Sequence, residues 1–276
     1  MSTEKQQTVG TVVALWRYPV KSMQGEELNA IRITERGLVG DRVYALIDGE
    51  TGKIVSAKNP KKWPHLFDFR AAFVEPPEGC GPVLPARITF PDGTAVTSTA
   101  PELNSMLSQG LGREVALESL PPKEPRLEEY WPDLEELDQR DTVTDEPMPP
   151  GSFFDGAPVH LLTTAALDRL REAYSDGRFE VRRFRPNIVI RPDADTSGFV
   201  ENEWVGRTLA IGEEVRLCIE RPCPRCVMTT LPQSDLPADT GILRAAARTN
   251  QGHVGVYATV VHGGTIRRGD SVRIEG

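Results

Sequence analysis

The clearest potential for chemistry lies in the segment Cys223-Pro-Arg-Cys226, where two residues separate a pair of cysteines. Thiols at this spacing are typical of a zinc half-site, of a redox-active dithiol, or of one thiolate that ligates a transition metal. Two small, buried and inert side chains give the same pattern. Zinc requires two further ligands, and His253 and His262 do not have the spacing of a ligand pair. A dithiol motif normally opens a helix, whereas the following VMTT is typical of a strand.

Charge around the pair bears on these interpretations. Arg221 and Arg225 flank the two cysteines, and cationic neighbours lower the pKa of a thiol and favour its thiolate. An ionised sulfur is a soft ligand that suits a transition metal held by other sulfurs. Cys80 lies in a loop-like stretch and Cys218 in an apolar strand, so neither is expected to act. The residues by themselves leave the metal thiolate and the inert pair open.

Residues that could bind an anion occur at three places in the sequence. They are Arg17, Lys21 and Ser22 in LWRYPVKSM, Arg42 after a Gly-Asp pair, and Arg182, Arg183 and Arg185 at the start of a strand-like run. Arginine offers bidentate donors to a phosphate, and lysine offers a point charge. Asn187 follows Arg185 at a two-residue interval, which places both side chains on one face of the expected strand. Taken singly, each basic residue is more often a solvated surface charge.

Other polar residues have a structural interpretation that is favoured without further context. Two pairs of hydroxyl residues stand at expected strand ends, namely Thr163 with Thr164 and Thr229 with Thr230. Such residues cap helices or favour strands. Tyr257 in GVYATVV has the pattern of a core aromatic residue.

The elements that must position these residues are mainly short strands. Apolar alternation and turn residues predict strands or hairpins over residues 10–20, 26–37, 42–57, 86–98, 158–163, 184–192, 209–220 and 255–276. The last of these segments reads as two strands around a Gly-Gly turn. Helical spacing predicts one helix that stops at Gly112, a second from about Thr164, and a third within residues 239–249. Many short strands with few helices predict barrels or bent sheets, and hence a mainly β (α+β) fold.

Residues 118–150 form a distinct segment between the two halves. Seven of them are proline, and residues 118–146 hold 11 acidic and 3 basic side chains. This composition favours a poorly regular, solvated acidic linker. Tyr130, Trp131 and Leu134 offer the alternative of a segment that is fastened to a domain surface as a strap over the edge of a site.

Composition also bears on partners and location. A formal net charge of −8 argues against general nucleic-acid binding, which needs a basic surface. No apolar run approaches the roughly 20 residues that span a bilayer, and the first residues, MSTEKQQT, lack the apolar core of a signal peptide. We therefore expect no nucleic-acid partner, no membrane association, a cytoplasmic location and reduced thiols.

Taken in order, the segments YPVKSMQG, GLVGDRVYALID, FRPNIVI, CPRCVMTT and VGVYATVVHGGTIRRGDSVRI resemble the MOSC superfamily. More narrowly, they are similar to proteins with an N-terminal MOSC β-barrel domain, a group that includes the mitochondrial amidoxime-reducing component and its bacterial relatives. The resemblance runs from about residue 9 to residue 275 and is weakest over residues 68–160. It implies an N-terminal barrel at residues 9–117, a connecting segment at 118–150, and a C-terminal MOSC barrel with a few short helices at 151–275.

The resemblance also implies a molybdenum–molybdopterin cofactor with Cys226 as the metal's protein ligand. Cys226 matches the second cysteine of the family's C-x-R-C motif, and the two dithiolene sulfurs of the pterin with oxo groups would complete the metal's shell. Matching positions imply a cofactor-binding set with Lys21, Ser22 and Arg42 at the phosphate, Thr163, Thr164, Arg185 and Asn187 at the pterin, and Arg225 and Thr229 as further members. Tyr257 matches an aromatic residue near the metal, and Tyr257 or Asp239 could deliver protons. At the level of the family, pyridoxal phosphate binding is implied as well.

The implied activity is reduction of N-hydroxylated, N-oxide or S-oxide type small molecules, with electrons from a separate flavin reductase or an iron–sulfur or haem carrier. Two alternatives are a sulfur carrier that uses a Cys226 persulfide and a cofactor-binding module without turnover. The segment LPQSDLPADTG after Thr230 is longer than the family's pattern, and the resemblance implies that this loop lies near the metal. We expect neither a ferredoxin domain nor a membrane anchor.

Overall fold

Strand β1 (Gln7–Arg17) closes a barrel whose other strands all come from the second half of the chain. The computed structural model describes residues 7–79, 81–193 and 196–275. Neighbouring strands of the barrel follow the order β13 (Ile188–Pro192), β12 (Val159–Thr163), β16 (His253–His262), β15 (Val215–Pro224), β14 (Thr208–Ile211), β18 (Ser271–Glu275) and β1. Because β1 pairs antiparallel with both β18 and β13, these seven strands form a closed barrel, and the fold is mainly β as predicted.

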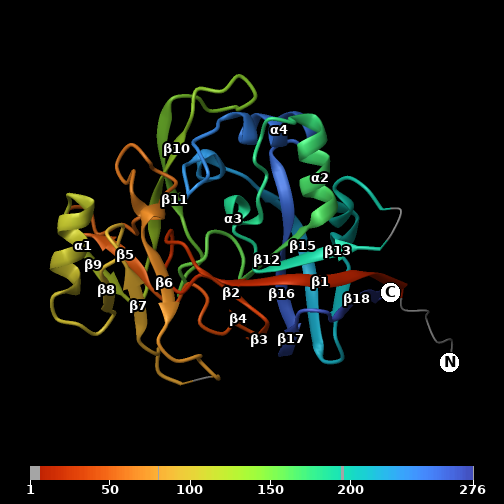
Figure 1. Ribbon diagram of the computed structural model, residues 1–276, viewed down its shortest axis with the longest axis horizontal. Coiled ribbons are helices and arrows are strands. Elements are labelled where there is room, and N and C mark those ends of the chain that lie inside the picture. Colours follow the sequence, from red (N-terminus) through yellow and green to blue (C-terminus); the bar gives the residue numbers. More distant parts are fainter. Residues whose placement is uncertain (1–6, 80, 194–195, 276) are drawn as a thin grey trace.

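Short helices cover one end of the barrel (Figure 1). β12 and β13 are parallel, so the chain needs a crossover between them, and α2 (Thr164–Ala173) with α3 (Val181–Phe184) supplies it. α4 (Gly241–Asn250) packs beside α2, and a 3₁₀ helix at Val200–Trp204 brings Trp204 into the barrel core. The barrel interior is apolar because inward positions of the strands, such as Leu15 and Leu217, are fully buried.

The predicted helices are confirmed. α2 begins after Thr163, whose hydroxyl accepts a hydrogen bond from the Ala166 amide at 3.1 Å and so caps the helix. α1 (Leu103–Leu111) ends at Gly112, which adopts φ +67 in the left-handed region that glycine tolerates. The hairpins predicted over residues 86–98 and 209–220 are also present.

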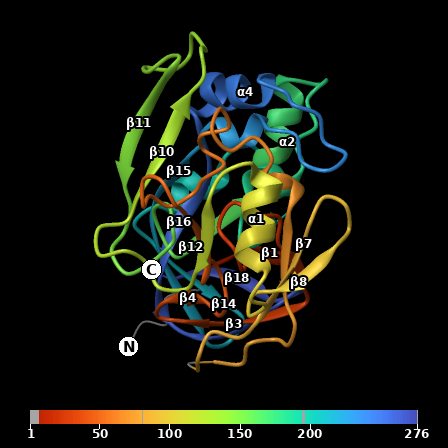
Figure 2. The same cartoon turned by 90° about the vertical axis from the view of Figure 1, so that its left-hand side faces the viewer.

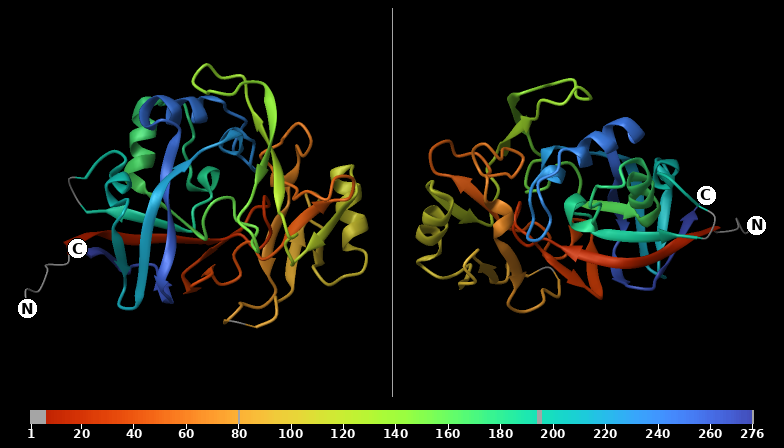
Figure 3. Two further views of the ribbon diagram at one scale, coloured as in Figure 1. Left: turned by 180° about the vertical axis from the view of Figure 1, so that it is seen from behind. Right: turned by 45° about the horizontal axis from the view of Figure 1, so that its top comes forward.

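The first half contains β2 (Glu26–Leu28), β3 (Ala30–Thr34), β4 (Gly37–Leu38), β5 (Ala45–Asp48), β6 (Arg70–Phe73), β7 (Ala86–Thr89), β8 (Ala95–Thr97), β9 (Val115–Glu118) and a 3₁₀ helix at Leu66–Asp68. Ile31 and Ile33 of β3 and Leu38 of β4 pack onto the barrel core, whereas the sheets of the later elements surround a second apolar core. β5 pairs with β9, and β6, β7 and β8 form one antiparallel sheet. Met228 of the second half packs into this core, so the two halves share apolar contacts. Figure 3 shows the first half lying beside the barrel from two further sides.

The expectation of an irregular acidic linker is wrong. Within residues 118–150, β10 (Arg126–Trp131) and β11 (Thr142–Pro147) form an antiparallel hairpin, which Figure 2 shows rising beside α4. Leu127 and Glu129 are buried, and the Trp131 indole donates to the Thr144 hydroxyl at 2.9 Å. The hairpin is regular because residues far away in the sequence hold it, as the site shows below.

Of three further local expectations, one is confirmed and two differ from the structure. The hairpin predicted over residues 42–57 is present, because the Asp48 and Val55 amides donate to the Lys53 and Leu46 carbonyls at 2.9 and 2.8 Å, and β5 pairs with β9 as well. The end of the chain contains three strands, because β17 (Gly264–Arg267) leaves the barrel and pairs with β3. VMTT forms a 3₁₀ helix, Val227–Thr230, instead of a strand. No helix in the described ranges is long and apolar enough to cross a membrane.

Candidate functional site

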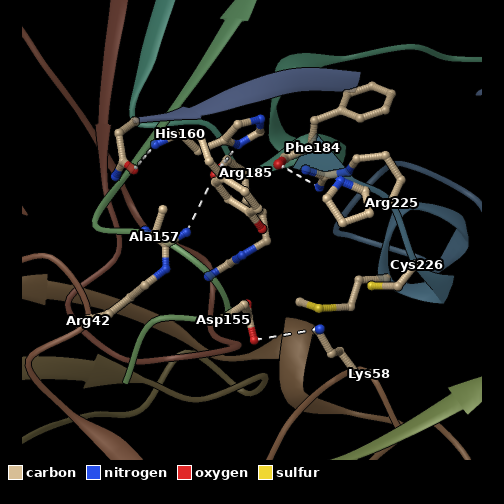
Figure 4. Close-up of a pocket in the computed structure, with 13 residues that line it drawn as sticks. Arg42, Lys58, Asp155, Ala157, His160, Phe184, Arg185, Arg225 and Cys226 are labelled. Atoms are coloured by element: carbon tan, nitrogen blue, oxygen red, sulfur yellow. Dashed lines mark hydrogen bonds and ion pairs between the residues drawn. The ribbon is translucent and has the colours of Figure 1, made fainter. Parts of the chain in front are cut away.

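An open cavity lies where the first half meets one end of the barrel, and its volume is about 570 Å³ when the adjoining space open to solvent is counted. Figure 4 shows the side chains of Arg42, Asp155, Lys58 and Cys226 gathered around one space. The residues that line it are Arg42, Lys58, Asp155, Ala157, His160, Phe184, Arg185, Asn187, Pro224, Arg225, Cys226, Met228 and Tyr257. Four of these side chains are cationic, whereas Asp155 alone among them is an acid, so the cavity favours an anion even though the chain is acidic.

Arg185 presents a buried guanidinium with an unused donor. It ends α3 in the left-handed conformation (φ +53), so it does not share a strand face with Asn187 as the interval predicted, although both line the cavity. Its Nη1 donates to the Met23 carbonyl at 2.7 Å, and its guanidinium lies 4.2 Å from the centre of the Tyr18 ring. Its Nη2 is buried without a hydrogen-bond partner among the described residues. Burial lowers the pKa of Arg185 to about 10, and an anion beside it would offset that cost.

Arg42 and Asn187 complete this end of the cavity. Arg42 pairs with the carboxylate of Asp41, and its Nη2 donates to the Arg185 carbonyl at 3.4 Å. The Asn187 side-chain oxygen accepts from the His160 amide at 3.1 Å, while its NH₂ group reaches a carbonyl of β1 at 3.4 Å. Asn187 therefore ties three barrel strands together at the wall of the cavity.

Lys21 and Ser22 stand behind the lining residues. The Lys21 ammonium lies 2.6 Å from Asp155 Oδ1, and the Ser22 hydroxyl accepts from the Ala57 amide at 3.1 Å. Burial would raise the pKa of Asp155, but the charges of Lys21 and Lys58 outweigh it and hold that pKa well below its ordinary value. Lys21 does not line the cavity itself, but it holds the carboxylate of Asp155, which does.

The two cysteines of the pair occupy different environments, and both are free thiols. Cys226 precedes the 3₁₀ helix at Val227–Thr230, is half-buried and lines the cavity. Cys223 is fully buried at the end of β15, where the Arg225 Nη1 donates to its sulfur at 2.9 Å. Cys226 is thus the cysteine whose sulfur a ligand in the cavity can reach.

Flanking arginines alone would lower the pKa of the Cys226 thiol, but in the structure it is the pKa of Cys223 that is lowered and that of Cys226 that is raised. Burial raises the pKa of the Cys223 thiol, but Arg225 and His160 outweigh it and lower the pKa to about 6. Burial and the charge of Glu129 raise the pKa of Cys226 to about 11 in the cofactor-free protein. The arginine next to the pair therefore acts on Cys223, because its guanidinium turns back toward β15.

His160 and Tyr257 flank the buried thiol. Their rings meet edge to face, with centroids 5.8 Å apart, and Arg221 lies over the Tyr257 ring at 4.8 Å. Burial and the neighbouring Cys223 raise the pKa of Tyr257 well above its ordinary value, so the hydroxyl stays protonated. Tyr257 is half-buried and lines the cavity, rather than being a core aromatic residue.

The turn that carries Cys226 is fixed by a hydroxyl and a buried arginine. The Thr229 hydroxyl donates to the Cys226 carbonyl at 3.0 Å. Arg183, also fully buried, donates to four backbone carbonyls, including those of Thr229 at 3.1 Å and Pro237 at 2.8 Å. Thr229 and Arg183 therefore position the turn and the loop after it, and neither lines the cavity.

Several residues predicted for the site lie elsewhere. Thr163 caps α2 and donates to the buried carboxyl of Glu201 at 2.5 Å, and neither it nor Thr164 lines the cavity. Asp239 accepts from the Gly241 amide at 2.8 Å, at the start of α4. The predicted anion binders Arg17 and Arg182 form ion pairs with Glu26 and Asp235 respectively. Cys80 lies outside the described residues.

Sequence reasoning missed Lys58, Asp155 and His160, all of which line the cavity. His160 had a signal, because it is a polar residue inside the otherwise apolar run PVHLLT. Lys58 and Asp155 lie in loops whose sequence gives no signal of a site. The folded structure shows their position, because Lys58 pairs with Glu129 of the hairpin at 2.9 Å and lies 3.8 Å from Asp155.

The zinc interpretation finds no ligand set. Across residues 7–79, 81–193 and 196–275, no three His, Cys, Asp or Glu side chains come together as they would around a metal ion. A structural zinc site needs such a set. A metal that brings most of its own ligands needs a single protein sulfur, and Cys226 offers one.

Comparison with protein families gives two matches that follow the order of the chain. Residues 9–100 match the MOSC N-terminal beta barrel domain, and residues 149–273 match the MOSC domain. Among solved structures, the YUAD protein from Bacillus subtilis aligns over 98% of this chain and 97% of its own, with 12% identity and a TM-score of 0.49.

Named relatives show low but extended similarity. Mitochondrial amidoxime reducing component 2 of Rattus norvegicus is 27% identical over 256 residues, which cover 86% of this chain and 70% of that protein. The Homo sapiens protein of the same name is 26% identical over 249 residues, with the same coverage of each chain. Molybdenum cofactor sulfurase of Oryza sativa subsp. japonica is 26% identical over 243 residues, 78% of this chain and 28% of that protein. The chain belongs to the MOSC superfamily, as a MOSC N-terminal beta barrel domain followed by a MOSC domain.

Proposed function

We propose that the protein is a molybdenum-cofactor-dependent reductase of N-hydroxylated, N-oxide or S-oxide type small molecules, with electrons from a separate donor protein. The observation that carries this proposal is one cavity that holds both a reachable cysteine sulfur, Cys226, and a buried guanidinium with an unused donor, Arg185. The names of the amidoxime-reducing and cofactor-sulfurase relatives support a function related to the molybdenum cofactor.

The residues of the cavity fit this cofactor. Arg42 and Arg185 would hold its phosphate, because both are cationic and Arg185 Nη2 has no partner among the described residues. Cys226 would ligate the metal, a role that suits a soft sulfur ligand. The cofactor, when bound, would supply the two-electron redox chemistry by which an oxygen atom leaves the substrate.

The chain's own residues would position the reactants and supply protons. Thr229 and Arg183 fix the turn that carries Cys226, so its sulfur is held at one place in the cavity. Tyr257 lines the cavity whereas Asp239 does not, and this position favours the Tyr257 hydroxyl as the proton donor. Metal binding to Cys226 requires loss of a proton from a thiol whose pKa is raised to about 11.

Turnover with a chemical donor tests the proposal. Cofactor-loaded protein is mixed with a reduced viologen dye and with an N-hydroxy, an N-oxide or an S-oxide compound, and dye oxidation is followed. We expect consumption of two electrons per substrate for at least one class, a loss of at least 100-fold in Cys226→Ser, and full activity in Cys218→Ser, whose thiol lies on β15 away from the cavity. Full activity in Cys226→Ser, or no activity of loaded protein toward any class, contradicts the proposal.

The relative named molybdenum cofactor sulfurase favours one alternative, a sulfur carrier that uses a persulfide on Cys226. Persulfide formation and metal ligation both need the Cys226 thiolate, so the burial that raises the pKa of this thiol does not separate the two candidates. Elemental analysis separates the candidates. About one molybdenum per chain supports the reductase, sulfane sulfur without molybdenum supports the carrier, and full molybdenum without turnover supports a module that only holds the cofactor.

A further inference from the structure

Lys58 places a cationic group in the cavity away from the end that Arg42 and Arg185 occupy. Figure 4 shows Lys58 and Cys226 on one side of the cavity and Arg42 on the other, with the Lys58 ammonium directed into the space between them. Asp155 lies 3.8 Å from that ammonium. Lys58 is therefore a neighbour of the proposed metal ligand, whereas the arginines that suit a phosphate are across the cavity.

The hairpin β10–β11 holds Lys58 in place through both its side chain and its backbone. The Lys58 ammonium donates to Glu129 Oε2 at 2.9 Å, and the Lys58 carbonyl accepts from the Tyr130 amide at 2.8 Å. Glu129 is 7% exposed, so water competes little for this pair. The far part of the hairpin is fastened to α4, because Glu136 lies 2.7 Å from Arg248. The acidic segment is thus a strap between the two halves that fixes one lysine at the edge of the cavity.

Lys58 keeps hydrogen-bonding capacity for a ligand. An ammonium has three N–H donors. Glu129 takes one of them, and Asp155 at 3.8 Å is an ion pair beyond hydrogen-bond distance. Burial lowers the pKa of Lys58, but the neighbouring carboxylates of Asp155 and Glu129 outweigh it and keep the group cationic. A preorganised cation with spare donors beside Cys226 is a site for an electron-rich oxygen atom.

We propose that Lys58 is the substrate-selecting residue of the cavity and donates a hydrogen bond to the oxygen of an N-oxide or S-oxide substrate. This inference rests on the proposed reductase function. Such an oxygen carries negative charge and is a strong acceptor, whereas the parent amine or sulfide has no oxygen to offer. Lys58 therefore favours the oxidised compound over its reduced product, which helps the product to leave. A charge-assisted hydrogen bond in a partly desolvated site corresponds to about a ten- to hundred-fold preference.

Equilibrium binding without turnover tests this inference. Pyridine N-oxide and pyridine, which differ by the one oxygen, are titrated calorimetrically into cofactor-loaded, oxidised protein with no electron donor present. We expect the wild type to bind the N-oxide at least tenfold more tightly than pyridine. Lys58→Met should abolish that preference, and Lys58→Arg, which keeps a cation, should retain most of it. The matched control is Lys61→Met, because Lys61 also pairs with the hairpin, through Asp141 at 2.7 Å, but does not line the cavity.

Three results would overturn the inference: equal affinities for the two compounds in the wild type, an undiminished preference in Lys58→Met, or loss of molybdenum from Lys58→Met, which would assign Lys58 to the cofactor. Removal of Lys58 leaves Glu129 buried and unpaired, so Lys58→Met/Glu129→Gln serves as a second variant that removes both charges. The viologen assay is separate from these titrations. A wild type that prefers the N-oxide but shows no turnover refutes the reductase and leaves the Lys58 contact standing.

Discussion

Two buried arginines two positions apart should respond in opposite ways to the same substitution. Arg183 donates to four backbone carbonyls and is fully buried, whereas Arg185 has one buried nitrogen without a partner among the described residues. Arg183→Met should therefore lower the free energy of unfolding, while Arg185→Met should leave the stability of the cofactor-free protein unchanged and weaken cofactor binding. The comparison distinguishes an arginine that stabilises the fold from one that binds a ligand.

The expected magnitudes follow from the contacts. A pKa of about 10 for Arg185, against an ordinary value of 12.5, means that its charge costs roughly 3 kcal/mol in the cofactor-free fold. Methionine removes that cost and forfeits a hydrogen bond of about 1 kcal/mol to Met23 and a cation–π contact of about 1–2 kcal/mol with Tyr18. We expect a change within about 1 kcal/mol. Arg183→Met leaves buried carbonyls unpaired and should cost about 3–5 kcal/mol.

The assay has two parts. Urea unfolding of cofactor-free protein gives the free energy of unfolding of both variants, and molybdenum analysis of protein purified from cofactor-producing cells gives occupancy. Arg185→Met should keep wild-type stability and lose at least about tenfold in cofactor affinity, which corresponds to about 1.4 kcal/mol. An Arg185→Met protein that is destabilised by more than about 3 kcal/mol, or that keeps full molybdenum occupancy at limiting cofactor, would refute the reasoning.

Two further predictions concern buried groups. The pKa of Cys223 is about 6 in the fold against 9.0 ordinarily, so its thiolate contributes stability that is complete above pH 9 and is lost as the pH falls through 6. Urea unfolding of cofactor-free protein should show a free energy of unfolding that changes by up to about 1.4 kcal/mol per pH unit between these values, and Cys223→Ser should lack this dependence. A stability difference between the two proteins that does not change with pH would contradict the prediction. Thr163→Val removes the cap of α2 and the donor to Glu201, so it should lower the free energy of unfolding by about 2 kcal/mol without loss of molybdenum. Molybdenum loss at unchanged stability would instead assign Thr163 to the pterin, and Thr164→Val is the matched control.

Local patterns were sufficient where local physics decides the structure. α1, with its stop at Gly112, and the β14–β15 hairpin follow from apolar spacing and turn residues, and the structure has both. The hairpin at residues 126–147 could not be read this way, because it is held by partners far along the chain such as Lys58 and Arg248. Its acidic composition is the complement of those cations and resembles that of a solvated linker.

The same distinction between local and long-range determinants applies to the residues of the site. Cys226, Arg42 and Tyr257 come together in the cavity, as the resemblance implied, although no local pattern brings them to one place. Thr163 and Asp239 do not line the cavity; the Thr163 hydroxyl caps α2, and an Asp239 carboxylate oxygen accepts from the Gly241 amide just before α4. Arg185 reaches the cavity by a left-handed turn that a strand-face argument cannot foresee.

The central claim is that Cys226, and not Cys223, ligates the metal of the molybdenum cofactor. X-ray absorption at the molybdenum edge counts the sulfur atoms bound to the metal in loaded protein. Two dithiolene sulfurs and one thiolate should give three sulfurs in the wild type and in Cys223→Ser, and two in Cys226→Ser. Three sulfurs in Cys226→Ser, or two in Cys223→Ser, would contradict the account.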